Sequence, residues 1–515
     1  MKKYIAYFLL IAPLFLFAQD LTIDANASIT VGNTATLDVS GAITNNGELI
    51  VEASSTVGSG SLIAKAASNP QITFRRTLSD SEWTLIGVPL TGETIADVDD
   101  NLLTQNGKSA IGIFSNSDNN YVNYDTGDNT VLTAGKGYQI ARSGTGSVDF
   151  VGNMVNADHT AAVTAESGTN GKWNLIGNPY PSYLNLTVDS DSATNNFMTV
   201  NADIISSESD AIYAWDGTAW DIYNQTTNDV NYVAPGDGFF IYVASSGNVS
   251  FTEDMQASGK GQGFTGNVAN SDDIGDSDIR TSSPNGGNYT SSSKKSSSLL
   301  EFSVTDDTQS SSWTRLYFDY DMTKGFDRGY DARAILMSPN KIFTKLLEDH
   351  QDVKFGIQAL PYDGINNFVI PLGIVTESSA LTLEITKNTL DNDFKIYLED
   401  KLLNVFKEIK EKIDLKFVVN GDGSDRFNLH FTDELIPEFA TDSNLRIYKV
   451  SENEIKIMGD PAKNYSAEIY DFSGRLINQV DFQHKINVSD LKKGIKILKI
   501  KSDDSVDVIK KFKLN

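Results

Sequence analysis

Short runs of alternating apolar and polar residues, separated by turn residues, cover most of the chain. In residues 19–66 such runs alternate with Gly-Asn, Ser-Gly and Asn-Asn-Gly turns, which predicts a strand-and-turn ladder. The small apolar positions of this ladder are Ile23, Ile29, Val31, Leu37, Val39, Ile43, Leu49 and Val51. A short β-solenoid or a strand-rich cap fits the pattern, although the segment has too few coils for a long solenoid.

A longer pattern then occurs twice in the same order. Each copy begins with Trp-x-Leu-Ile-Gly-x-Pro, at Trp83 and at Trp173, and continues with an Ala-Ile strand and aromatic residues. "GKGYQI" from Gly135 and "GDGFFI" from Gly236 follow, and a Val-x-Phe strand closes each copy. The glycines allow tight bends and the prolines end the ladders. The matching order predicts a duplicated β-rich unit, over residues 67–160 and 161–256.

The second half of the chain starts with a change in composition. Ser, Gly, Asn and Asp dominate residues 257–298, as in a flexible linker. Residues 299–435 contain about nine strand-like runs, the pattern of a β-sandwich. Val405, Ile409 and Ile413 have helical spacing, so a short helix is an alternative there. About seven short strands in residues 441–515 predict a small immunoglobulin-like sandwich. The fold class is therefore all-β and multidomain.

The N-terminus has the form of a secretory signal over residues 1–18. Lys2 and Lys3 precede an apolar run, and Ala18 supplies the small residue before a cut ahead of Gln19. The run is shorter than the roughly 20 residues that a membrane span needs. No later stretch could span a membrane as a helix, so no transmembrane segment is expected in the mature chain.

Composition excludes several kinds of chemistry. The chain of 515 residues has no cysteine, which excludes thiol catalysis and cysteine metal sites. Its net charge of −26 argues against nucleic acid as a partner, because phosphate binding needs a basic surface. The four histidines are far apart, and His430 is expected at a surface or interface, on the face opposite Phe427, Leu429 and Phe431. "GKG" and "GDG" lack the following helix that a phosphate loop requires.

Two acidic loops leave alternatives open. Residues 318–332 carry Asp319, Asp321, Asp327 and Asp331 among aromatics, and residues 420–427 read "NGDGSDRF". Calcium binding is one interpretation of both, and carboxylate catalysis a further one for the first. Structural turns are the favoured interpretation, with a hairpin turn at 420–427. No cofactor, metal site or catalytic residue is therefore predicted.

Aromatic residues suggest a binding surface. Trp215, Trp220 and Tyr223 could stack on sugar rings, although such residues more often lie in the core of a sandwich.

The C-terminal segment resembles the type A sorting domain of the type IX secretion system. The matching words are "AEIYDFSGRLI" from Ala467, "INVSDLKKGIKILKI" from Ile486 and the basic end "VIKKFKLN". The resemblance implies export through the outer membrane, removal of the domain on arrival, and release or surface attachment. It departs from the family at Lys496, where Tyr is common. By analogy, the positions recognised by the secretion machinery are Asp471, Gly474, Arg475, Gly494, Lys510 and Lys511.

The repeated "LIGNPYPS" units and the "GFDRGYDA … PLGI … YLEDK … RF" segment resemble regions of large exported proteins of Bacteroidetes-type bacteria, the group that uses this secretion system, and those proteins are usually uncharacterised or adhesin-like. The leading hypothesis is a non-enzymatic secreted or cell-surface protein for adhesion or matrix interaction, in which two tandem modules raise avidity. The alternative is a carbohydrate-binding module accessory to polysaccharide degradation. A glycan hydrolase is less favoured, with Asp327 and Asp331 as its only carboxylate pair. The partners implied are the secretion machinery and an extracellular glycan or surface ligand.

Overall fold

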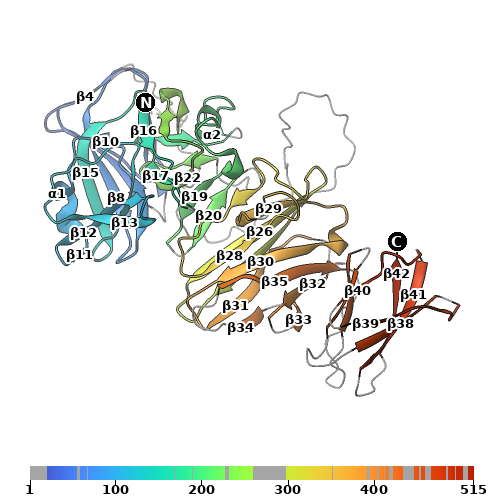
Figure 1. Cartoon of the computed structure of the whole chain (residues 1–515). Helices are drawn as coiled ribbons and strands as arrows, with labels where there is room; N and C mark the ends of the chain where they lie inside the picture. The colour runs from blue at the N-terminus through green and yellow to red at the C-terminus, as the bar shows by residue number, and fades with distance from the viewer. Residues whose placement is uncertain are drawn as a thin grey trace, which may run out of the picture. The chain divides into compact units, whose positions relative to one another are not determined.

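The computed structural model confirms an all-β chain (Figure 1). It describes residues 20–258 and 297–514, apart from 55–57, 67, 169, 188–189, 218, 225, 227–230, 351, 391–394, 403–404, 411, 417–421, 433–445, 452–453, 459–464, 472, 483–484, 493 and 503–507. The chain divides into an N-terminal body, Met1–Ser277, and a C-terminal body, Asp278–Asn515. In the described part, no helix has both the length and the apolar character needed to cross a bilayer. The predicted signal segment with Ala18 and Gln19, and nearly all of the predicted linker, lie outside the described residues.

The N-terminal body begins with stacked parallel strands, here called the solenoid segment. Its strands are β1 (Leu21–Ile23), β2 (Ser28–Val31), β3 (Thr36–Val39), β4 (Ile43–Asn45), β5 (Glu48–Ser54), β6 (Gly58–Ser59) and β7 (Ser61–Ala64). β1 pairs in parallel with β4, β2 with β5, and β3 with β7, so successive coils stack on three faces. The alternating small apolar residues fill the inside of these coils, and this is the geometry of a β-solenoid.

The solenoid segment continues without a break into the first motif unit. This unit contains β8 (Gln71–Leu78), β9 (Thr84–Gly87), β10 (Leu90–Thr91), α1 (Ile95–Val98), a 3₁₀ turn (Asp99–Asn101), β11 (Thr104–Gln105), β12 (Lys108–Ser115), β13 (Asn120–Asp125), β14 (Gly137–Ile140) and β15 (Gly146–Met154). β8 pairs in parallel with β5 on one side and antiparallel with β15 on the other. One apolar core therefore extends from Ile23 to Met154.

The second motif unit completes the N-terminal body. It contains β16 (His159–Val163), β17 (Trp173–Gly177), β18 (Tyr183–Asn185), α2 (Phe197–Val200), β19 (Ile212–Trp215), β20 (Trp220–Tyr223), β21 (Tyr232–Val233), β22 (Gly238–Tyr242), β23 (Gly247–Phe251), β24 (Gln256–Ala257) and 3₁₀ turns at Ser207–Ser209 and Glu253–Met255. Its main sheet has the order β17-β22-β19-β20, and that of the first unit β9-β14-β12-β13. Strands matched through the two sequence motifs thus occupy the same places in the two sheets.

The two motif units meet at Gly87 and Gly177, the glycines of the two Trp-x-Leu-Ile-Gly-x-Pro stretches. A Cβ added to Gly177 would lie 2.4 Å from the Gly87 Cα, and one added to Gly87 would lie 2.8 Å from the Gly177 Cα. The Gly87 N–H donates to the Gly236 carbonyl at 3.0 Å, and the Gly177 N–H donates to the Gly135 carbonyl at 3.1 Å. We call this contact the seam. Its bonds are reciprocal, as in an isologous interface between two copies.

The bends that supply these carbonyls also need glycine. Gly135 and Gly236 have φ of +77° and +74°, a region in which side chains are rarely tolerated. Each begins a Gly-x-Gly run, and in each run the second glycine lies against the backbone or side chains of the other unit. The two Gly-x-Gly stretches therefore serve the close approach of two backbones.

The C-terminal body contains an 11-stranded sheet in its described residues. Its elements are β25 (Ser298–Thr305), β26 (Ser311–Asp319), β27 (Ala332–Arg333), β28 (Lys341–Thr344), β29 (Phe355–Pro361), a 3₁₀ turn (Ile365–Asn367), β30 (Val369–Val375), β31 (Ala380–Asn388), β32 (Lys395–Asp400), β33 (Val405–Glu408), β34 (Lys412–Lys416) and β35 (Asp422–Thr432). The sheet curls around one core, so that Phe318 of β26 and Phe431 of β35 are in contact, with ring centroids 5.7 Å apart.

Three local predictions for this region are wrong. The helix over Val405 to Ile413 is replaced by β33 and β34, because Phe406 and Ile413 are needed as buried strand residues at the two ends of the curled sheet. Of residues 420–427, predicted as a hairpin turn, 422–427 form the start of β35, and 420–421 lie outside the described residues. His430 does lie on the face opposite Phe427, Leu429 and Phe431. It is nevertheless buried, because Phe406 packs on its ring and Glu399 lies 2.8 Å from its Nε2.

The C-terminal segment forms two small sheets. Their strands are β36 (Arg446–Ser451), β37 (Glu454–Met458), β38 (Tyr465–Asp471), β39 (Leu476–Phe482), β40 (Lys485–Asn487), β41 (Gly494–Ser502) and β42 (Val508–Leu514). The sheet orders are β36-β37-β40 and β39-β38-β41-β42. A separate core lies at Ala467, Ile469, Leu498 and Ile500, together with Tyr465, Ile486 and Val488.

The seam leads to a stability prediction. Gly177→Ala is expected to lower the free energy of unfolding by about 1–3 kcal/mol or more, because the new methyl group overlaps the Gly87 backbone. Gly32→Ala is the matched control, since its Cβ would lie 3.7 Å from Glu52 Oε2, an ordinary contact. Thermal and urea unfolding of both variants measures the difference. Equal stabilities would contradict the close approach at the seam.

Candidate functional site

A row of aromatic side chains lies along the junction of the two motif units. Its contacting rings are those of Tyr121, Phe114, Phe240, Trp220 and Trp215, and Trp83 is joined to them through its backbone carbonyl; we call these six residues the aromatic row. Ring centroids are 5.4 Å apart between Tyr121 and Phe114, 4.9 Å between Phe114 and Phe240, 5.4 Å between Phe240 and Trp220, and 5.3 Å between Trp220 and Trp215. At its end, the Trp215 Nε1 donates to the Trp83 carbonyl at 3.1 Å. The first three contacts are edge-to-face and the Trp220–Trp215 contact is tilted, and such contacts fix the rings relative to one another.

Trp83 is the exposed member of the row, with 41% of its surface accessible. Trp173 has the matched position in the second motif and is 2% exposed. Trp173 packs edge-on against Tyr213 and Tyr242, with centroid distances of 4.6 and 5.0 Å. The same framework thus buries one Trp and exposes the other.

The sequence explains this difference. Ile111 pairs with Ile140, and Ile212 pairs with Ile241, which aligns the two sheets. The residues that follow are Gly112 and Ala141 in the first unit, in place of the two tyrosines of the second. Trp83 therefore lacks the two tyrosines that enclose Trp173, and its side chain is exposed.

The structure separates the three aromatics that the sequence suggested. Trp215 and Trp220 are half-buried, directly opposite one another on β19 and β20. Tyr223 is paired with Ile212, on the other face of the hairpin, where it packs against the core of the second unit. Trp83 is the residue that sequence reasoning missed as a site residue. The change from two tyrosines to Gly112 and Ala141 was the signal that could have found it.

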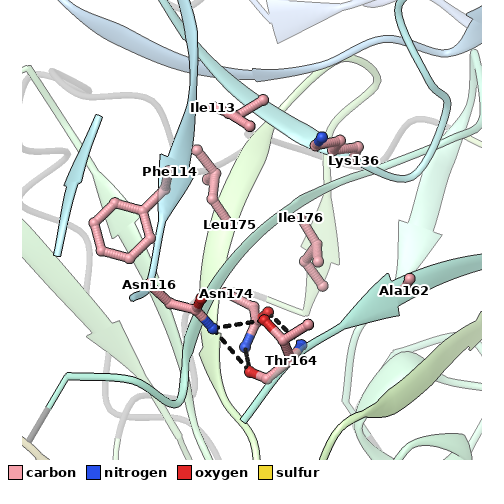
Figure 2. A pocket seen from close by; sticks show the side chains of 9 residues that line it. All are labelled: Ile113, Phe114, Asn116, Lys136, Ala162, Thr164, Asn174, Leu175 and Ile176. Atoms are coloured by element: carbon pink, nitrogen blue, oxygen red, sulfur yellow. Dashed lines mark hydrogen bonds between the residues drawn. The ribbon is translucent and has the colours of Figure 1, made fainter. Parts of the chain in front are cut away.

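A cavity of about 180 Å³ opens at the seam (Figure 2). We call it the seam pocket, and its lining residues are Ile113, Phe114, Asn116, Lys136, Ala162, Thr164, Asn174, Leu175 and Ile176. Phe114 belongs both to this pocket and to the aromatic row. The two features are therefore continuous with each other.

A network of amides fixes one wall of the seam pocket. The Asn116 Nδ2 donates to the Thr164 Oγ1 at 2.7 Å and to the Thr164 carbonyl at 2.9 Å. The Asn174 Nδ2 donates to the same carbonyl at 2.8 Å, and its Oδ1 accepts from the Thr164 N–H at 2.9 Å (Figure 2). Thr164 thus links Asn174 of β17 to Asn116, the residue that follows β12. Residues of both motif units therefore form this wall.

The acidic loop at residues 318–332 uses its carboxylates internally. The buried Asp331 accepts from the Ala359 N–H at 2.7 Å and from the Asp327 N–H at 2.6 Å. Asp327 accepts from the Thr323 N–H at 2.7 Å, and Asp319 from the Asp321 N–H at 3.0 Å. In the part of the chain that the structure describes, no three His, Cys, Asp or Glu residues lie close enough together to hold a metal ion. The geometry is that of a loop closed by side-chain acceptors.

The sorting-domain motif forms a turn between β38 and β39. The Asp471 Oδ1 accepts from the N–H groups of Ser473 and Arg475, both at 3.0 Å, and Gly474 has φ of +83°. Arg475 is ion-paired to the Asp471 Oδ2 at 3.2 Å, yet its side chain is 79% exposed. Asp471 and Gly474 therefore build the turn, and Arg475 is the residue that the turn presents.

The other predicted recognition residues lie on neighbouring strands. Gly494 begins β41 with φ of +116°, and Lys510 and Lys511 lie in β42, opposite Leu498 and Ile497. Lys496, where the family often has Tyr, is buried and lies opposite Asp471. The departure from the family pattern is thus accommodated next to the Asp471 turn.

Comparison with protein families gives two matches. Residues 11–431 match a family described as a domain of unknown function (DUF8693), and residues 451–515 match the secretion system C-terminal sorting domain. Because the first match covers most of the chain, the protein belongs to the DUF8693 family. No curated protein matches the sequence. The resemblance to the type IX sorting domain is confirmed, so the protein is a type IX substrate that reaches the cell surface or the extracellular space.

Two buried carboxyl groups predict a pH-dependent stability. Burial raises the pKa of Asp331 to about 7, and burial, with a smaller contribution from the charge of Asp97, raises that of Glu93 to about 7. In the unfolded chain both pKa values lie near 4, so the folded state binds protons more tightly. Their stabilisation is complete below pH ~4 and is lost as the pH rises through 7.

The measurement is urea unfolding between pH 5 and 8. Each group contributes a slope that approaches ~1.4 kcal/mol per pH unit. Glu93→Gln should remove the contribution of Glu93 to this slope and raise the free energy of unfolding above pH 7, because the Gln oxygen can accept the hydrogen bond that the Val151 N–H donates to Glu93. An unchanged slope in this variant would contradict the assignment.

The turn of the sorting domain predicts a separation of folding from export. Arg475→Ala should leave the domain folded, because the Arg475 side chain is exposed, and lower the amount of protein outside the cell by roughly tenfold, the effect of one lost charged contact. Immunoblots of medium, surface and periplasmic fractions measure export. Lys501→Ala is the control, because Lys501 is also ion-paired and partly exposed. Equal export of both variants would exclude Arg475 as a recognition residue.

Proposed function

We propose that this exported DUF8693 protein is a non-enzymatic adhesion or matrix-interaction protein, and that its aromatic row binds extracellular glycan. The observation that carries the proposal is the exposure of Trp83 at a position where the second unit buries its Trp. A contiguous apolar surface on a soluble domain commonly marks a binding site, and the partly exposed rings of the aromatic row offer such a surface. A flat indole matches the apolar face of a sugar ring, and its N–H can bond to a hydroxyl.

The rigidity of the row supports this proposal. Trp215 is held by Trp220 and by its hydrogen bond to the Trp83 carbonyl, and Trp220 is held by the buried Phe240. Side chains fixed in this way lose little conformational entropy when a ligand binds. A sugar that stacks on Trp83 would therefore meet a preformed surface.

The same geometry changes how we interpret the two motifs. We infer that they are copies of one unit, because their sheets have the same order and their seam bonds are reciprocal. Packed against each other, they form one composite surface and not two independent modules. Trp83 comes from the first unit, and Trp215 and Trp220 come from the second. The affinity then depends on the seam and not on avidity between separate sites.

A carbohydrate-binding module that assists polysaccharide degradation is the second candidate. The aromatic row favours it equally, because both functions need stacking on sugars. A hydrolase in this chain is less well supported, since Asp327 and Asp331 already accept hydrogen bonds from the backbone. The two candidates differ in whether the protein acts on cells or with secreted enzymes.

The test is glycan binding by the secreted protein collected from the medium. Trp83→Ala should lower the affinity for an insoluble or arrayed polysaccharide by about tenfold or more, while the melting temperature changes little. Trp215→Ala should have a similar effect on binding. Tyr320→Ala is the matched control, because Tyr320 is an exposed aromatic of the other body, 39% accessible. Surface plasmon resonance or pull-down measures binding.

Three results would decide the matter. Loss of binding in the Trp variants alone supports the aromatic row. Equal binding by all variants places the glycan site elsewhere. No binding to any glycan, combined with retained adhesion to cells, would overturn the glycan and keep an adhesive function with a protein ligand.

A further inference from the structure

Lys136 lies at the edge of the seam pocket without a partner. Its side chain is half-buried, and no ion pair or hydrogen bond to its amino group occurs within the described residues. Burial lowers the pKa of Lys136. Figure 2 shows the amino end of Lys136 turned to the side of Ile113. An unpaired, partly desolvated ammonium group is unfavourable unless something binds it.

In the second Gly-x-Gly stretch, the charged middle residue has an ion-pair partner. Asp237 has the position matched to Lys136, and its carboxylate is buried against Arg76 at 2.9 Å. Arg76 lies opposite Val148 on β15, and the matched residue, opposite Val249 on β23, is Ala161. The first Gly-x-Gly therefore carries a charge, and the position matched to its partner is occupied by an alanine.

The pocket next to Lys136 has the size and lining for a small polar group. Its volume of about 180 Å³ equals that of roughly six water molecules. Phe114 lines it with an aromatic ring, and Asn116 and Asn174, both bonded to Thr164, line it with polar groups. A single sugar residue with one charged substituent could place its ring at Phe114 and its charge at Lys136.

The overall charge restricts the ligand further. The chain has a net charge of −26, so a densely charged polyanion would be repelled. A ligand with a single carboxylate is repelled much less, because the negative charges of the protein are screened beyond ~8 Å at physiological salt.

We propose that the seam pocket binds the carboxylate of a uronic acid, carried as an occasional side group on an otherwise neutral glycan, with Lys136 as its cation. This inference rests on the proposed function, because the aromatic row would hold the neutral part of the same glycan. Phe114 connects the two, since it lines the pocket and contacts Phe240 in the row.

The first experiment compares a xylan with glucuronate side groups and the same xylan with its carboxyl groups reduced. The wild-type secreted protein should prefer the acidic form by about tenfold, the value of one charged hydrogen bond. Lys136→Met should lose this preference and keep its affinity for the reduced xylan. Lys136→Arg should retain part of it. Lys65→Met is the control, because Lys65 is exposed on the solenoid segment.

The second experiment observes the pocket directly. In protein labelled with ¹³C-lysine, the Lys136 signal is assigned by its absence in Lys136→Arg and titrated with D-glucuronate and with D-glucose. Glucuronate should raise the pKa of Lys136, glucose should not, and the Lys65 signal should stay unchanged with both.

The outcomes separate the two proposals. Equal binding of both xylans by the wild type and by Lys136→Met overturns the uronate site and leaves the aromatic row intact. If neither xylan binds, the proposed glycan function is excluded for these polymers. The titration of Lys136 with glucuronate then tests the carboxylate site in the pocket independently. If glucuronate does not change the pKa of Lys136, the carboxylate site is excluded, whatever the xylans show.

Discussion

The contact between Gly87 and Gly177 is the constraint on which the N-terminal body depends. With a Cβ on either residue, the two backbones could not approach to the distances observed, and the reciprocal bonds from Gly87 to Gly236 and from Gly177 to Gly135 could not form together. The aromatic row and the seam pocket both use residues from the two motif units. They exist only because these glycines let the two sheets meet.

Because the two motif units have matching sheets, we expect function at the positions where the two units differ. Trp173 is caged by Tyr213 and Tyr242, whereas Trp83 is left exposed by Gly112 and Ala141. Asp237 is neutralised by Arg76, whereas the position matched to Arg76 in the second unit is Ala161, which offers no charge to Lys136. A duplicated framework allows one copy to remain structural while the other loses a partner residue and gains an accessible group.

The chain also separates binding from delivery. The sorting domain has its own small core, and its Asp471 turn presents Arg475 by means of a side-chain acceptor and a left-handed glycine. None of these residues belongs to the seam or to the aromatic row. Export can therefore be changed by mutation without touching the surface that we propose for glycan.

The sequence by itself determined the class of structure and the destination. Strand alternation, the doubled motif and the Asp-x-x-Gly-Arg turn are local signals, so the all-β fold and the sorting domain could be predicted from them. Only the tertiary structure decided which side chains are exposed. Tyr223 faces the core, His430 is covered by Phe406, and residues 405–408 and 412–416 pair as strands, because residues distant in sequence form the surfaces around them. Burial depends on such long-range packing, which a local pattern does not contain.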